Sequence, residues 1–405
     1  MSSQSMSNQE CIPDFKTEAI LNPDISFDSP LKEDIDEPKS IFLTGATGFL
    51  GAYLLRELID QTTANIYCLI RCHTLETGKQ RLKENLQSYQ LWQQHFDDRI
   101  IPMLGDLAQP LLGLSEKEFC QLATEIDVIY HNGSENDPIT PYSQMKTVNV
   151  LGTQEILKLA GLRKTKPVHF ISTVAIFFSQ AQRQDTPIRE TDFPLFSPSL
   201  NTGYKQSKWV AEELIHLAQK RGLPVSIYRP TRIMGDSKTG IYRKSNNFFF
   251  QFIQICIKLG KFPTFDVDIN IIPIDYASQA IVYLSRQKQL SGKTFHLVNP
   301  ESISWQRLFE LINACGYATE AVSDKNWLVM VENYLFEQGG EKAVSSWFPI
   351  ILKSAKMIGQ TKPRFDAYQT IEGLAHSSIV CHPLDLSLIS IYLLAWKKYE
   401  TKMLN

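Results

Sequence analysis

The stretch TGATGFLG, residues 44–51, constrains the fold of this chain more than any other. It follows an apolar run, Ile41–Leu43, and precedes AYLLRELI, whose apolar residues recur at helical spacing. Glycines three residues apart let a strand turn tightly into a helix, approach a pyrophosphate closely and pack the helix on the sheet. A glycine triplet between a strand and a helix therefore predicts dinucleotide binding. The expected cofactor contacts in this turn are Gly45, Thr47, Gly48, Phe49, Leu50 and Gly51.

Further apolar runs alternate with helical patterns along the next 250 or so residues. Such alternation with short links predicts an α/β fold, a doubly wound parallel Rossmann sheet with right-handed crossovers. We expect a smaller, mostly helical C-terminal domain beyond the last strand. The expected strands after the first cover residues 65–71, 100–107, 127–133, 168–173, 223–230 and 293–300.

The second strand ends on Arg71, where a carboxylate would be expected if the ribose 2′-hydroxyl of NAD were held. Arg71, with Arg81 ten residues on, suits a 2′-phosphate instead. NADPH is therefore predicted over NADH. The alternative is a loop arginine with no cofactor role.

Residues at the carboxyl ends of the later strands also line the crevice of such a sheet. Asp106 and Leu107 are expected beside the adenine, and Asn132, Gly133 and Ser134 along the cofactor. His131, which precedes Asn132 at the end of its strand, is interpreted as structural.

The segment NTGYKQSKWVAEELI, residues 201–215, places Tyr204 and Lys208 four residues apart on a predicted helix. Side chains at that spacing share a helical face, so the lysine ammonium is expected to favour the ionised phenol and lower its pKa. Tyr204 would then exchange protons near neutral pH. The alternative is an exposed pair on a solvated face. Trp209 is interpreted as a core residue.

A chain of 405 residues is too long for one ordinary core, which predicts two packed units. Residues 1–38 carry nine acids against two lysines and are expected to form an irregular lead-in that packs loosely through Ile20, Leu21 and Ile25. Residues 39–300 form the predicted nucleotide-binding domain, within which the aromatic segment 240–262 contributes to the substrate side. Residues 301–405 form the predicted helical substrate domain.

The formal net charge of −2 gives no basic excess for a nucleic-acid partner. Seven scattered cysteines favour a reducing compartment, and their spacing completes no metal site. The apolar run Leu388–Trp396 is far shorter than the roughly twenty residues of a membrane span. With no targeting pattern at the start, we expect a cytoplasmic protein without a membrane partner.

Together these pieces resemble the thioester reductases, a family of extended short-chain dehydrogenases/reductases. The family includes the terminal reductase domains of nonribosomal peptide synthetases and carboxylic acid reductases. The resemblance covers about residue 40 to the C-terminus and rests on TGATGFLG, LIR, GDL, HNG, PYSQMKTVNVLGTQEIL, STVAIF, GYKQSKWVAEELI, IYRPTRIMG, IPIDYASQAIVYLS and FHLVNP.

The resemblance implies NADPH-dependent reduction of an acyl or peptidyl thioester on the phosphopantetheine arm of a carrier protein. Release as an aldehyde, or further reduction to an alcohol, would follow. The chain opens with Met1 and contains no carrier domain, so we expect a freestanding or excised unit, acting as a monomer.

The resemblance also assigns roles to individual residues. Thr173, Tyr204 and Lys208 become the catalytic set. Tyr204 and Lys208 are also expected to contact the cofactor, Lys208 at the nicotinamide ribose, and Pro230 and Thr231 lie near the nicotinamide. Thr173 and Tyr204 suit this chemistry because a thioester carbonyl that receives hydride needs hydrogen-bond donors already in place.

The resemblance leaves the roles of some other residues open. Asn149 either supports a water beside Lys208 or is a capping or packing residue. Glu135–Pro138 departs from the apolar stretch usual in the family, at the expected mouth of the site, which bears on substrate preference or activity. Because carrier proteins are acidic, Arg243, Lys244 and the C-terminal helices are expected to form the docking patch.

Two other functions fit the same fold. A sugar-nucleotide epimerase or dehydratase would use the same triad, although such enzymes prefer an acid where Arg71 stands. The alternative of a different class is a redox-inactive NADP-binding protein that acts as a sensor or scaffold. The unusual Glu135–Pro138 stretch favours this alternative.

Overall fold

A parallel sheet organises the computed structural model of this chain, which describes residues 15–30, 37–137, 139–180, 186–196, 200–242, 248–358 and 363–403. Within these residues the sheet has seven strands in the order β11-β6-β5-β4-β1-β2-β3, and every pairing is parallel. The predicted doubly wound fold is confirmed. The strands are β1 (Ser40–Thr44), β2 (Asn65–Ile70), β3 (Ile100–Leu104), β4 (Val128–His131), β5 (Val168–Ile171), β6 (Val225–Pro230) and β11 (Thr294–Leu297).

The strand order reverses at β1, which pairs with β2 on one edge and with β4 on the other. Chain connections leave the sheet in opposite directions at this point, so a crevice forms outside the carboxyl ends of β1 and β4. The glycine turn follows β1, and residues 132–134 follow β4, so both segments meet at that crevice.

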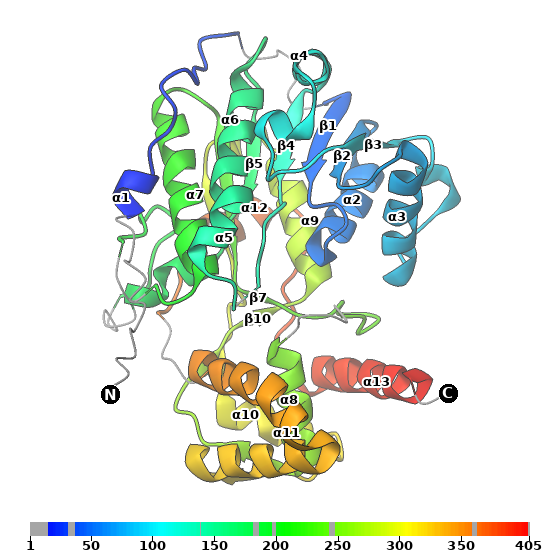
Figure 1. Ribbon diagram of the computed structural model, residues 1–405, viewed down its shortest axis with the longest axis vertical. Coiled ribbons are helices and arrows are strands. Elements are labelled where there is room, and N and C mark those ends of the chain that lie inside the picture. The colour runs from blue at the N-terminus through cyan, green and yellow to red at the C-terminus, as the bar shows by residue number, and fades with distance from the viewer. Residues whose placement is uncertain are drawn as a thin grey trace, which may run out of the picture.

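Helices cover both faces of the sheet (Figure 1), because successive residues of a buried strand point to opposite sides. In β1, Phe42 packs into one apolar cluster, and Ile41 and Leu43 pack into the other. The Phe42 side is covered by α4 (Glu116–Glu125), α5 (Tyr142–Lys146), α6 (Gly152–Gly161) and α7 (Gly203–Lys220), and the opposite side by α2 (Phe49–Gln61), α3 (Leu75–Ser88), α9 (Ile274–Ser285) and α12 (Tyr368–Leu374).

A third apolar cluster lies beyond the carboxyl ends of the strands, in the lower part of Figure 1. Trp305 and Trp327 are almost fully buried there, and Phe252 packs against both rings. The cluster is built by α8 (Phe248–Leu259), α10 (Trp305–Ala314), α11 (Asp324–Ile358) and α13 (Leu386–Met403).

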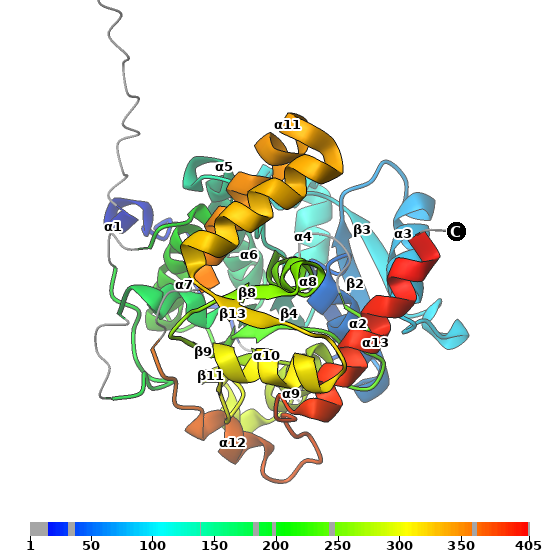
Figure 2. The same ribbon diagram turned by 90° about the horizontal axis from the view of Figure 1, so that it is seen from below.

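Short strand pairs join segments of this helical cluster to one another and to the main sheet. They are β7 (Arg232–Ile233) with β10 (Ile271–Ile272), β8 (Lys261–Pro263) with β13 (Glu320–Val322), and β9 (Asp268–Ile269) with β12 (Ile303–Ser304). The view from below shows α11 and α13 on opposite sides of α8 (Figure 2).

The C-terminal segment agrees with its sequence pattern in one place and differs from it in another. The pattern predicts two helices, over 326–338 and 345–358, and the backbone of α11 breaks between them, at Gly339 and Gly340. No helix is predicted at α12, which leaves the helical cluster and packs against β11 and α9. Gly373 permits that approach, because a Cβ there would lie 2.5 Å from Leu284 Cδ2.

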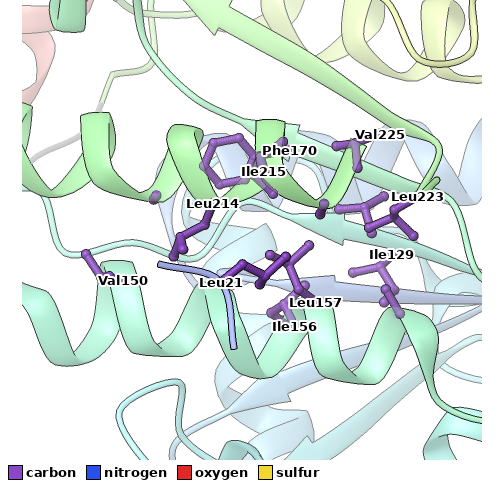
Figure 3. Packing of buried hydrophobic residues seen from close by; sticks show 14 of the residues in the cluster. Leu21, Ile129, Val150, Ile156, Leu157, Phe170, Leu214, Ile215, Leu223 and Val225 are labelled. Carbon is purple, nitrogen blue, oxygen red and sulfur yellow. The ribbon is translucent and has the colours of Figure 1, made fainter. Parts of the chain in front are cut away.

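The lead-in packs closely against the sheet domain from Phe15 to Pro30. Leu21 and Ile25 are buried as expected, whereas Ile20 is 61% exposed. Figure 3 shows Leu21 among side chains of α6 and α7. The Arg221 guanidinium donates to three backbone carbonyls of the lead-in, those of Leu21, Asn22 and Ile25. None of the helices in the described ranges has the length and apolarity needed to cross a membrane.

Candidate active site

A cavity of about 680 Å³ lies at the carboxyl ends of the strands, between the sheet and the helical cluster. It gathers the predicted site residues with two exceptions, Gly51 and Lys208. The predicted residues that line it are Gly45, Thr47, Gly48, Phe49, Leu50, Arg71, Arg81, Asp106, Leu107, Asn132, Gly133, Ser134, Thr173, Tyr204, Pro230 and Thr231.

The glycine turn brings the backbone close enough for a bound pyrophosphate. Gly45 has φ of +73°, and a Cβ there would lie 2.8 Å from Gly133 Cα. Gly51 does not line the cavity; a Cβ on it would lie 1.9 Å from Gly45 O, so it lets α2 pack against the turn. Gly48 begins α2 without a side-chain cap, which leaves backbone N–H groups at the cavity wall for an anion. These features fit a dinucleotide.

Two arginines stand together where the second strand ends. The Arg81 guanidinium donates to the carbonyl oxygen of Arg71, and both side chains are exposed and line the cavity. Both residues therefore line the part of the cavity that follows β2.

The remaining strand ends are held by short hydrogen bonds. Asp106 Oδ1 accepts from Ala108 N at 2.9 Å, and Gly133 N donates to Thr44 Oγ1 at 2.8 Å. His131 is buried between the hydroxyls of Thr44 and Thr153, and burial, with Lys208, lowers its pKa to about 3. A neutral imidazole that holds two strand ends is a structural residue, in agreement with its interpretation above.

Thr173 and Tyr204 meet in the cavity from different elements. Thr173 follows β5, and Tyr204 lies in the first turn of α7. The two side chains are hydrogen-bonded to each other. Thr173 Oγ1 also contacts Pro230 O at 3.4 Å. Gly203 lets α7 start against the 140–142 loop, because a Cβ there would lie 2.5 Å from Thr140 O.

The prediction that Lys208 lowers the pKa of Tyr204 is wrong for the protein without a bound cofactor. Lys208 Nζ donates to Ile171 O at 2.7 Å and lies 4.2 Å from the centre of the Phe170 ring, so it faces β5 rather than the cavity. Burial raises the pKa of Tyr204 to about 12, and its hydrogen bond to Thr173 only partly opposes the rise. Burial lowers the pKa of Lys208 to about 7 against the charge of Glu212. Desolvation by burial dominates the pKa of both groups.

Asn149 holds the unusual segment at the mouth of the cavity. It lies in a π-helical turn, Thr147–Leu151. Its Oδ1 accepts from Glu135 N at 2.7 Å, and its Nδ2 donates to Glu135 O at 2.8 Å and to Ser207 Oγ at 2.9 Å. These hydrogen bonds give Asn149 a packing role. Support of a water beside Lys208 stays a prediction. Glu135 and Asn136 line the cavity, and Pro138 lies outside the described residues.

Sequence reasoning missed two groups of site residues. One is a buried cluster behind Thr173, in which Ser172 donates to Glu212 and Glu212 pairs with Arg229. The helical pattern of α7 could have indicated Glu212, which lies one turn after Lys208. The other group forms the substrate half of the cavity, defined here as Ile139, Phe178, Lys205, Arg232, Phe248, Phe249, Ile350, Lys353 and Ile358. Of these, Phe248 and Phe249 fall in the aromatic segment 240–262 that was expected on the substrate side, and Ile350, Lys353 and Ile358 fall in the predicted substrate domain.

The expected carrier-docking residues Arg243 and Lys244 lie outside the described residues.

A crevice that accepts a dinucleotide, with a Tyr–Thr pair beside its inner end, defines a nicotinamide-dependent oxidoreductase of the short-chain type. Comparison with known proteins narrows this class. Residues 43–281 match the family described as male sterility protein, an NAD-binding family. The chain belongs to this family, and within it to the terminal reductase domains of peptide synthetases.

A linear gramicidin synthase of Brevibacillus parabrevis is 43% identical over 80% of this chain. L-2-aminoadipate reductase of Schizosaccharomyces pombe is 30% identical over 76% of the chain. The chain spans only 6% and 23% of the lengths of these two relatives. Among solved structures, the terminal R domain of the myxalamid PKS-NRPS pathway is 40% identical with a TM-score of 0.86, and the match covers 95% of this chain and 97% of that domain.

Proposed function

We propose that this protein uses NADPH to reduce an acyl or peptidyl thioester, carried on the phosphopantetheine arm of a carrier protein, and releases the acyl group as an aldehyde. The observation that carries this proposal is the Thr173–Tyr204 pair in the same cavity as the glycine turn. Reduction of a carbonyl needs a hydride source and oxyanion donors within one water-poor space.

NADPH would supply the hydride to the thioester carbonyl carbon. Thr173 and Tyr204 would hold the carbonyl oxygen as negative charge develops there. The raised pKa of Tyr204 keeps its proton in place until the oxygen becomes basic enough to accept it. The resulting hemithioacetal then loses its hydroxyl proton, its C–S bond breaks, and the sulfur leaves as the thiol. The products are an aldehyde and the free arm.

NADPH is proposed over NADH because Arg71 and Arg81 stand together at the end of β2. A guanidinium binds phosphate through charge-assisted hydrogen bonds that a ribose hydroxyl cannot replace. Action as a monomer is part of this proposal.

A carrier protein is proposed as the partner because the chain resembles terminal segments of multidomain synthases. The relative from Brevibacillus parabrevis is named as part of a synthase, and the solved relative is named as a terminal domain of a PKS-NRPS pathway. Such domains receive their acyl group from the assembly line. The proposed docking patch includes Arg243 and Lys244, and reversing both to Glu should reduce turnover of carrier-bound substrate while pantetheine thioesters react normally.

The proposal is tested with purified protein, NADPH and a pantetheine thioester. Loss of cofactor absorbance and formation of a trapped aldehyde are expected together, in equal amounts. The free acid serves as the control and should give neither signal. Binding of NADPH without oxidation by any thioester would favour the sensor alternative, and reaction with a sugar nucleotide instead would favour the epimerase.

A further inference from the structure

The substrate half of the cavity is mostly apolar but contains an arginine with an unusual environment. Phe178, Phe248 and Ile350 are among the side chains that give this half its apolar wall. Arg232, on β7, lines the same wall. Its guanidinium carbon lies 3.9 Å from the centre of the Phe249 ring. A cation placed against an aromatic ring in a ligand cavity is held in position and faces whatever ligand enters.

Arg232 has no carboxylate partner among the described residues. Its contact with Phe249 is accompanied by desolvation, which lowers the pKa of Arg232 to about 10 without a compensating acid. Charged groups that lose water are normally paired, because an isolated charge is expensive to desolvate. The cavity therefore contains a cation that forms no ion pair with the described residues.

Arg229, three residues earlier, shows how this chain satisfies an arginine that serves only the fold. Its guanidinium donates to Glu212 Oε1 from Nε at 2.9 Å and from Nη2 at 2.6 Å. It also donates to the backbone oxygens of Glu190 and Asp192. Two arginines of one segment thus differ: Arg229 is fully paired behind the sheet end, and Arg232 faces the cavity without an ion pair to any acid among the described residues.

The position of Arg232 places it near the reacting carbonyl rather than near the nucleotide phosphate. Thr173 contacts the carbonyl oxygen of Pro230, and Arg232 follows two residues later, a step of about 7 Å along an extended chain. Arg71 and Arg81 follow β2, on the other side of the strand-order reversal. A group bound by Arg232 would therefore belong to the acyl part of the substrate.

We propose that Arg232 binds a carboxylate on the acyl group, so that the preferred substrates are thioesters of dicarboxylic or acidic acyl chains. The inference rests on the proposed thioester reduction and names its substrate class. A guanidinium matches a carboxylate with two parallel hydrogen bonds, and the apolar wall around it would pack the methylene groups between the carboxylate and the thioester. The phosphate of the carrier arm is the other anion of the substrate and is distinguished by experiment.

The test compares glutaryl and adipoyl thioesters of pantetheine with their ω-methyl esters, which have the same chain without the charge. Pantetheine carries no phosphate, so a charge preference seen with it belongs to the acyl group. The wild-type protein should show kcat/KM about tenfold or more higher for the acids. Arg232→Met should lower kcat/KM for the acids about tenfold to a hundredfold and change the value for the methyl esters less than about threefold, with unchanged NADPH affinity.

Arg232→Lys should retain part of the preference, because it keeps the charge and loses the bidentate geometry. Arg307→Met, at an exposed arginine paired with Glu310 on α10, is the matched control and should leave kcat/KM unchanged for both kinds of substrate.

Equal rates for acids and methyl esters in the wild type would overturn the proposal. Equal losses for both in Arg232→Met would also overturn it. A preference seen only with phosphopantetheine thioesters would overturn it too, and would assign Arg232 to the arm phosphate. Reduction of the methyl esters keeps the proposed function independent of these outcomes.

Discussion

The two halves of the cavity are built in different ways. The nucleotide half consists of turns that directly follow strands, and its shape depends on local backbone requirements such as the positive φ of Gly45. The substrate half, in contrast, is assembled from segments far apart in the chain, among them Phe249 on α8 and Ile350 on α11. In the proposed function, one half binds an invariant cofactor, whereas the other has to fit a particular acyl group. Local structure fixes the cofactor site, and long-range packing shapes the substrate site.

The halves also differ in what stabilises them. On the sheet side of the cavity, behind Thr173, the residues Glu212, Arg229 and His296 form a buried polar network that continues to Glu190 and α12. The helical cluster beside the substrate half depends on aromatic packing, such as Phe262 stacked on Phe309 at 4.0 Å between centres. The sheet side should therefore respond strongly to changes of charge, and the helical side to changes of volume.

The largest effect expected is on the polar network. Glu212→Gln should lower the free energy of unfolding by about 3 kcal/mol, because Arg229 would remain buried without a full counter-charge. Chemical denaturation measures this. Glu310→Gln, which removes an exposed ion pair with Arg307, is the control and should change stability by less than about 1 kcal/mol. Equal effects of the two substitutions would contradict the role given to the network.

The same residue predicts a pH dependence. Burial raises the pKa of Glu212, but Arg229 and His216 outweigh it, and the pKa falls from 4.5 to about 2. A carboxyl whose pKa is lower in the folded state stabilises the fold above its unfolded pKa and loses that contribution as pH falls toward the folded one. Stability should therefore decline between about pH 4.5 and 2. The part of this decline due to Glu212 should be missing in Glu212→Gln.

The next largest effect is expected on the rate of the reaction, which takes place at the boundary between the two halves of the cavity in the proposed function. Tyr204→Phe should reduce kcat about a hundredfold or more, because the carbonyl oxygen loses its proton donor, with NADPH affinity nearly unchanged. Steady-state kinetics and cofactor titration measure the two quantities. Tyr368→Phe, at a tyrosine that is 66% exposed, is the matched control. A loss below about tenfold in Tyr204→Phe would assign proton delivery to another group.

A smaller effect is expected when a glycine at a close backbone contact is replaced by alanine, and a glycine within an ordinary helix serves as the comparison. Gly51→Ala should destabilise the protein by about 1–3 kcal/mol and weaken cofactor binding, because its Cβ would overlap Gly45 O. Gly78→Ala on α3 is the comparison. Its Cβ would meet Pro102 Cβ at 3.2 Å, and the gain in helix propensity should offset most of the crowding. Thermal unfolding with and without NADPH distinguishes the two variants.

The smallest effect expected is on cofactor choice. Arg71→Ala should weaken NADPH binding about tenfold and leave NADH binding nearly unchanged, because in the proposed complex the Arg71 guanidinium contacts only the 2′-phosphate. Fluorescence titration with both cofactors measures this. Equal weakening for both would mean that Arg71 shapes the loop instead of selecting the phosphate.

Local sequence patterns predicted the site residues that lie next to the boundaries of strands and helices. The glycine turn, Arg71 and Tyr204 all stand next to a strand or helix boundary that periodicity reveals, so their positions in the cavity could be predicted. The direction of Lys208 could not, because it depends on the carbonyl oxygen of Ile171 on a neighbouring strand. The partnership of Glu212 with Arg229 and the approach of α11 to the cavity likewise depend on contacts between distant segments. Helical spacing places two side chains on one face and does not determine which group each one meets.

The transfer of hydride to a thioester carbonyl is tested most directly with NADPH that carries deuterium at C4 of the nicotinamide, on either face in separate samples. The protein is mixed with a pantetheine thioester, and the released aldehyde is trapped and analysed by mass spectrometry. One of the two labelled samples should give an aldehyde with a single deuterium on its carbonyl carbon. An aldehyde without deuterium from both samples, or release of the free acid alone, would contradict the proposed reduction.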